Sequence, residues 1–189
     1  MLISKYDNTD IEQFISDYET KHEFAFPTQY REFLFKFNGG DTPETEFTIG
    51  KISSDLEGLF GLGNANEFLN YSFFDSMDGI RDFLEDLMLP IGINVFGDFI
   101  VIGIGEENNG KIFFLYHDRP KKYIELVGSF ELFVSKCKSK EIGYIWTIEE
   151  RKAELIANGL GDELTQDRIN GWQAEIDAYS NMRQEELVL

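Results

Sequence analysis

The chain has few of the side chains that carry out covalent or metal chemistry. Its 189 residues include one cysteine, Cys137, and two histidines, His22 and His117. A single cysteine excludes an intrachain disulfide and indicates a reducing compartment. One cysteine and two distant histidines also exclude an ordinary zinc site of four such ligands. We therefore expect no metal site and no cofactor.

Nucleophilic and acid–base catalysis have little support for the same reason. His117 precedes Asp118, so a general base oriented by a carboxylate is conceivable. A structural histidine at the end of a strand is the favoured interpretation, and Cys137 fits a packing position on a helix. The sequence predicts a protein that is not an enzyme.

Basic residues and long apolar runs are scarce as well. Seventeen Lys and Arg face thirty-five Asp and Glu, which gives a net charge of −18. Such a charge repels nucleic acid and anionic lipid surfaces. No apolar stretch approaches the roughly 20 residues of a membrane span, and the apolar run at the N-terminus is too short for a signal peptide. These features predict a cytoplasmic protein.

The acidic residues are concentrated in the middle of the chain. From Asp41 to Asp118 there are fifteen acidic residues and three basic ones. A solvated surface is one interpretation, and a docking face for a basic protein is the other. The residues that we consider for such a face are Asp41, Glu44, Glu46, Asp75, Asp78, Asp82, Glu106 and Glu107.

Part of this acidic region also bears on metal binding. Asp75, Asp78, Asp82 and Asp86 share one face if residues 72–87 are helical, and their oxygens would suit magnesium or calcium. The segment lacks the spacing of a calcium-binding loop. A ridge that faces solvent or a partner is favoured.

Aromatic residues are plentiful, with 18 Phe and 8 Tyr, and they predict a sizeable core. Residues 26–40 describe a helix with a start and a stop. Pro27 suits the first turn, apolar residues recur at helical spacing, and Asn38-Gly39-Gly40 ends the helix over 28–38. Thr9 and Glu12 form a capping-box pattern before another amphipathic helix over 10–21.

The middle of the chain predicts an antiparallel sheet. Strands are expected over 46–49, 59–62, 99–104, 111–117 and 123–127, and a helix over 129–138. Residues 99–104 and 111–117 flank an Asn-Gly turn and are apolar on both faces, so they predict central strands covered on each side.

The segment 141–189 differs from what precedes it. Thr147 and Glu150 repeat the capping-box pattern, and a longer helix is expected to begin at Thr165 and extend to about 187. Its apolar stripe needs a surface to cover. We therefore predict a domain over 1–140 and a helical extension over 141–189 that packs on the domain or recruits a partner.

The order of these motifs resembles the SUKH superfamily over about residues 8–138. The resemblance depends on Phe-Pro-x-x-Tyr-x-x-Phe-Leu-x-x-x-Asn-Gly-Gly, Leu-Pro-Ile-Gly, Gly-Asp, an Asn-Gly turn and His-Asp. Phe26 stands where leucine is usual, and the segment after about Lys140 extends beyond the usual domain. The residues on which the resemblance to the SUKH superfamily depends are Pro27, Tyr30, Phe33, Leu34, Asn38, Gly39, Gly40, Pro90, Gly92, Gly97 and Asp98.

The resemblance implies an α+β fold with an antiparallel sheet flanked by helices, and binding rather than catalysis. Many members are bacterial immunity proteins of polymorphic toxin systems, and one branch contains a yeast regulator of cell-wall glucan synthesis. We thus expect an immunity protein that binds a basic toxin domain, often a nuclease. A regulatory scaffold that uses the helix over 165–187 is the alternative.

Overall fold

The structure is a computed structural model that describes residues 1–76 and 79–189. The chain divides into two compact units: residues 1–140 together with 184–189, and residues 141–183. No helix in the described residues is both long and apolar enough to cross a membrane.

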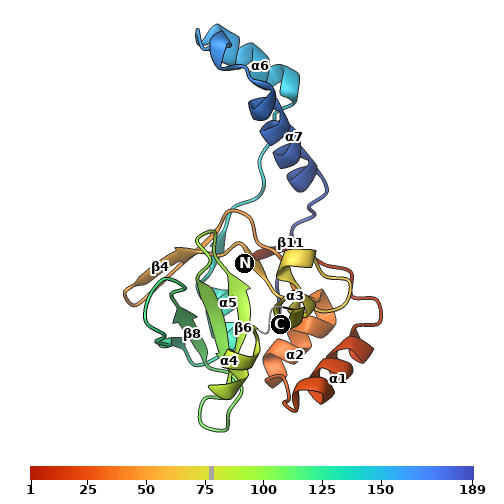
Figure 1. The fold of residues 1–189 in the computed structure, drawn as a ribbon, viewed down its shortest axis with the longest axis vertical. Helices are drawn as coiled ribbons and strands as arrows, with labels where there is room; N and C mark the ends of the chain where they lie inside the picture. Colours follow the sequence, from red (N-terminus) through yellow and green to blue (C-terminus); the bar gives the residue numbers. More distant parts are fainter. Residues whose placement is uncertain (77–78) are drawn as a thin grey trace. The chain divides into compact units, whose positions relative to one another are not determined.

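Two N-terminal helices supply much of the core of the first unit. Helix α1 spans Ile11–His22 and helix α2 spans Thr28–Phe37, and the two lie side by side (Figure 1). Helix α2 begins after Pro27, as the sequence predicts, and Asn38 ends it with a φ of 53°. The predicted capping box of α1 is wrong, because the N-cap is Asp10 and the Thr9 hydroxyl donates to Asp7 instead.

The main sheet is antiparallel throughout, which confirms the predicted α+β fold. Its order is β11-β1-β2-β5-β6-β7-β8-β9. The strands are β1 (Leu2–Lys5), β2 (Gly40–Asp41), β5 (Gly58–Leu59), β6 (Met88–Ile93), β7 (Phe99–Gly103), β8 (Ile112–Leu115), β9 (Ile124–Val127) and β11 (Glu185–Glu186).

A second sheet of three antiparallel strands completes the β structure. Strand β3 (Thr45–Ile49) lies between β10 (Lys138–Ser139) and β4 (Ile52–Asp55). Phe47 of β3 is buried against Phe114 and Phe133, so this sheet shares the core of the main sheet.

Both faces of the central strands are covered, as their apolar sequences predict. On one face lie α2 and α5 (Phe130–Lys136), where the Phe130 ring packs edge-to-face against Tyr30 and tilted against Phe33. The other face carries a smaller cluster that includes Val101 and Phe113, covered by α4 (Arg81–Glu85). The short helices η1 (Glu67–Leu69) and α3 (Tyr71–Ser76) connect β5 to α4.

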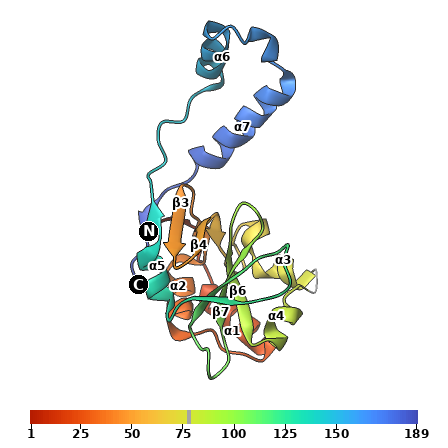
Figure 2. The ribbon, with the colours of Figure 1, turned by 90° about the vertical axis from the view of Figure 1, so that its left-hand side faces the viewer.

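The second unit is a pair of helices, visible as α6 and α7 in Figure 2. Helix α6 spans Ile148–Ala157 and begins at the predicted capping box of Thr147 and Glu150. After the short helix η2 (Gly161–Glu163), helix α7 spans Gln166–Ser180. None of these helices has a buried residue, and the two terminal nitrogens of the Arg151 guanidinium, Nη1 and Nη2, each donate to Glu175 at 2.8 Å.

The last residues of the chain return to the first unit. Helix α7 ends at Ser180 instead of about 187, and Glu185–Glu186 pair with β1. Leu187 is buried, its N–H donates to Met1 at 2.9 Å, and the two termini lie close together in both views (Figures 1 and 2). The predicted extension therefore consists of a helical part, 141–183, and a strand that completes the sheet.

This arrangement predicts that two deletions differ in their effect on stability. Replacing 141–183 with a Gly/Ser linker of about four to six residues joins two points already close together, since Gln184 donates to the Lys140 carbonyl at 3.3 Å. Deleting 141–189 also removes Leu187, whose burial contributes about 1.5–3 kcal/mol. Urea unfolding should show the linker variant close to the intact chain and the truncation less stable. Equal losses would contradict the role of β11.

Candidate partner-binding surface

The acidic residues singled out from the sequence lie on several elements of the first unit. Asp78 lies outside the described residues. The others are Asp41 in β2, Glu44 before β3, Glu46 in β3, Asp75 in α3, Asp82 in α4, and Glu106 and Glu107 in the turn between β7 and β8. Of these, all but Asp41 and Asp75 are exposed.

Asp75 is neutralised by residues of its own chain. Its carboxylate is only 14% exposed, pairs with Lys21, and lies 3.0 Å from Nε2 of His22. It joins α3 to the end of α1. The condition for Asp75, Asp82 and Asp86 to share one helix face is not met, because α3 ends at Ser76 and α4 begins only at Arg81. Gly79 lies in the turn between them.

A different group of carboxylates lies where the segment after β4 hydrogen-bonds to the segment after β2 and to the start of β3. We call Asp41, Glu46, Asp55 and Glu57 the acidic edge. Glu46 lies directly opposite Asp55 in the β3–β4 pair, and the Thr42 N–H donates to the Glu57 carbonyl. Asp55 and Glu57 were missed from the sequence, although their alternation with buried Leu56 marks an outward-facing pair.

The electrostatics of the acidic edge are unfavourable within the protein. Burial raises the pKa of Glu57, and the charges of Asp55 and Asp41 raise it further. Burial also raises the pKa of Asp41, although the Tyr6 hydroxyl, which donates at 2.7 Å, lowers it. Like charges opposite each other on neighbouring strands are destabilising. No Lys, Arg or His in the described residues forms an ion pair with these four carboxylates.

Glu106 and Glu107 form a smaller acidic group in another place. Their turn lies beside the end of α4, because the Ile104 N–H donates to the Leu87 carbonyl and the Asn108 amide donates to the same oxygen. Leu87 has a φ of 55° and is 55% exposed. This group is therefore separate in sequence and hydrogen bonding from the acidic edge.

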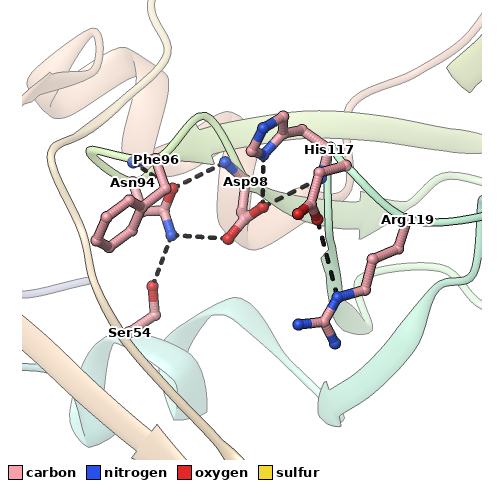
Figure 3. A network of polar contacts seen from close by, with 7 residues as sticks. Ser54, Asn94, Phe96, Asp98, His117 and Arg119 are labelled. Carbon is pink, nitrogen blue, oxygen red and sulfur yellow. Dashed lines mark hydrogen bonds and ion pairs between the residues drawn. The ribbon is translucent and has the colours of Figure 1, made fainter.

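The turn between β6 and β7 is held by the side chain of Asn94 (Figure 3). The Asn94 carbonyl oxygen accepts from the N–H groups of Phe96 and Asp98, at 3.0 and 2.8 Å. Its amide nitrogen donates to the Ser54 hydroxyl and to the Asp98 carboxylate, at 3.0 and 3.1 Å. Asn94 and Asp98 are both buried, so this network fixes the turn against β4.

Asp98 connects the same turn to the end of β8. Its carboxylate accepts from the His117 N–H at 3.1 Å and lies 2.9 Å from Nδ1 of the His117 ring. Burial raises the pKa of Asp98, but the hydrogen bonds from His117 and Asn94 outweigh burial and bring the pKa below its usual value. The hypothesis that Asp118 orients His117 is wrong, because Asp98 holds the ring and Asp118 pairs with Arg119 at 3.8 Å.

Asp98, His117 and Asp118 can also be considered as metal ligands. One donor atom from each lies within 4.8 Å of the others. Asp98 already accepts from Asn94 and His117, and Asp118 faces a guanidinium. These internal contacts account for the arrangement. Cys137 is buried, and burial raises the pKa of its thiol to about 12, which fits a packing role.

A family model described as the SMI1 / KNR4 family (SUKH-1) matches residues 12–136. The chain belongs to this family. No curated protein matches the chain. The SUKH-1 match includes α1, α2 and the central strands, and it ends before the helices of 141–183. Membership supports an immunity or related regulatory role based on protein binding.

The motif residues of the SUKH-1 domain are mainly structural. The Tyr30 hydroxyl donates to the Phe60 carbonyl at 3.0 Å and contacts the Tyr71 hydroxyl at 3.1 Å, and Tyr71 donates to the Pro90 carbonyl at 2.8 Å. All of these groups are buried. These buried hydrogen bonds therefore join α2 to the sheet, while the acidic edge lies on other strands and turns.

The electrostatics of the acidic edge predict a stabilising substitution. Glu57→Gln removes one of the mutually repelling charges and should raise the free energy of unfolding at pH 7 by a few tenths of a kcal/mol, because solvent screens this exposed group. The folded-state pKa of Glu57 is raised, so the wild-type penalty appears as pH rises above about 4.3 and is absent in stronger acid.

Urea unfolding from pH 3 to pH 8 would measure this difference. Glu32→Gln, on an exposed position of α2 outside the acidic edge, is the matched control. A stability gain that is the same at every pH, or that the control shares, would contradict repulsion at the acidic edge.

Proposed function

We propose that this protein is an immunity protein that binds and neutralises a basic toxin domain, a nuclease, of a polymorphic toxin system. The observation that carries the proposal is the acidic edge: Asp41, Glu46, Asp55 and Glu57 lie together without an ion pair in the part of the chain that the structure describes. Lys and Arg of a partner would relieve this repulsion.

The chemistry of a nuclease fits this surface. Enzymes that act on nucleic acid present Lys and Arg to the phosphates, and a polyanionic protein surface competes for the same groups. The net charge of −18 further favours the encounter with a basic partner through its long-range field. The surface also opposes binding of nucleic acid by the immunity protein itself.

The second candidate function is a regulatory scaffold in which residues 141–183 recruit a partner. Its support is that these residues lie outside the SUKH-1 match and expose large apolar side chains, including Tyr144 and Ile156. The linker variant without 141–183 distinguishes the two functions. Toxin neutralisation by this variant would favour the SUKH-1 domain as the binding unit.

The test begins with the gene beside that of this protein, where the proposal expects a basic toxin domain, and uses that domain as a catalytically inactive variant. We expect a complex in biolayer interferometry, and rescue of growth when the active domain is expressed with the immunity protein. Binding should weaken as salt rises, because charges are screened over about 8 Å at physiological ionic strength. No complex at low salt and no rescue would overturn the proposal.

The double variant Glu46→Gln/Glu57→Gln tests the acidic edge itself. Both side chains are exposed, and Asp55, which also supports the β6–β7 turn, is left unchanged. We expect association to slow by roughly threefold to tenfold at low salt, with a smaller change in dissociation. Glu12→Gln/Glu32→Gln removes the same charge from exposed positions of α1 and α2. Equal slowing by both double variants would show that net charge, and not the acidic edge, steers the partner.

A further inference from the structure

The β6–β7 turn places two large apolar side chains in solvent. Phe96 is 72% exposed and Val95 is 62% exposed. Single exposed apolar residues are common on protein surfaces and need no explanation. Val95 and Phe96 differ from such single residues because they are adjacent and lie at the tip of one turn. Hydrogen bonds with the buried Asn94 side chain hold that turn in place.

The backbone of the β6–β7 turn is held by hydrogen bonds with Asn94 and by the conformation of Gly97. Asn94 is 3% exposed, and its side chain makes hydrogen bonds to both ends of the turn and to Ser54 (Figure 3). Gly97 has a φ of 89°, a conformation that side-chain-bearing residues rarely adopt. The Gly97 N–H donates to the main-chain carbonyl oxygen of Asn94 at 3.1 Å. Phe96 is therefore presented by a preorganised backbone.

The apolar tip lies directly beside the acidic edge. The Val95 N–H donates to the Asp55 carboxylate at 3.2 Å, and Asp55 lies opposite Glu46 in the neighbouring strand pair. A partner that covers the acidic edge therefore meets Val95 and Phe96 at the same time. This charge pattern favours a partner in which basic side chains surround an apolar pocket.

We propose that Phe96, supported by Val95, is the hydrophobic anchor of the complex and inserts into an apolar pocket of the basic toxin domain. This inference rests on the proposed function and adds to it the residue that holds the partner after the charges have steered it. Aromatic side chains in desolvated pockets dominate many interfaces, and a rigid turn loses little conformational entropy on binding.

The anchor and the acidic edge should differ in kinetics. Loss of an anchor acts mainly on dissociation, whereas loss of peripheral charge acts mainly on association. Phe96→Ala should raise the Kd for the inactive toxin domain by roughly 30-fold or more, through faster dissociation. The slope of the binding constant against salt concentration should stay unchanged, because no charge is removed.

Phe68→Ala is the matched control. Phe68 is 70% exposed, lies on η1, and has a ring contact only with Phe73 in the described part of the chain. We expect the Kd of this variant to remain within about twofold of wild type. Both substitutions remove an exposed ring, so thermal unfolding should show similar stability for the two variants and the wild type.

The outcomes separate this inference from the function on which it rests. If the wild type does not bind the toxin domain, the proposed function fails. If the wild type binds and Phe96→Ala binds equally well, only the anchor is overturned. A self-association of the wild type that Phe96→Ala abolishes, measured by sedimentation without the toxin domain, would assign the tip to a second copy of this chain and would also overturn the anchor.

Protection from hydrogen exchange gives an independent measurement. In the wild-type complex, the backbone amide groups of the acidic edge and of the β6–β7 turn should be more protected from hydrogen exchange than in the free protein. Protection confined to other elements would contradict the proposed anchor even if Phe96→Ala weakened binding.

Discussion

The junction between helix α2 and the main sheet depends on the hydrogen bonds of the Asn38 side-chain amide. Its nitrogen donates to the carbonyls of Asp7 and Leu62, at 2.7 and 2.9 Å, and its oxygen accepts from the Leu62 N–H at 2.8 Å. Asn38 is fully buried, so these bonds form in a low dielectric where an unpaired amide would be costly. One residue thus ends α2 and joins it to the segments before α1 and after β5.

The backbone around Asn38 leaves no room for larger residues. A Cβ on Gly39 would lie 2.6 Å from the Leu59 carbonyl oxygen, and one on Gly61 would lie 2.0 Å from the Asn38 carbonyl oxygen. Gly39 also has a φ of 77°. The Asn-Gly-Gly motif therefore fits the close approach of the end of α2 to β5, where a larger residue than Gly39 would clash with backbone.

The sequence predicts the parts of the fold whose signals are local. Pro27 and Asn38 define α2, the Asn-Gly turn defines the β7–β8 hairpin, and Thr147 with Glu150 begins α6. Pairings between distant segments leave no comparable signal. The return of Glu185–Glu186 to β1 spans almost the whole chain, and no local motif marks it.

The candidate surface was predicted in part for the same reason. The charge excess between Asp41 and Asp118 indicates an acidic face, but the choice of residues depends on strand register. Glu46 meets Asp55 only because β3 and β4 pair in one register, and Asp75 is neutralised by α1, which is more than fifty residues away in sequence. In the β6–β7 turn, Asn94 and Gly97-Asp98 are turn-forming residues that could have indicated an ordered tip.

Buried polar groups and the exposed carboxylates differ in how well they are paired within this protein, and this difference bears on function. In the described residues, every buried side-chain nitrogen and oxygen atom has a hydrogen-bond partner. The carboxylates of the acidic edge instead face one another without a basic partner in that part of the chain, at a cost in stability. Selection for stability alone would replace one of them.

The carboxylates of the acidic edge repel one another, and they lie next to the ordered β6–β7 turn. This combination is consistent with a surface that binds a partner. The rigid turn limits the entropy lost on binding, and the repelling carboxylates gain when cations approach them. Binding surfaces commonly carry such a cost in the free protein, because the groups that stabilise a complex are unsatisfied without it. The same scaffold can therefore keep its buried polar network while the residues at the edge and the tip change with the partner.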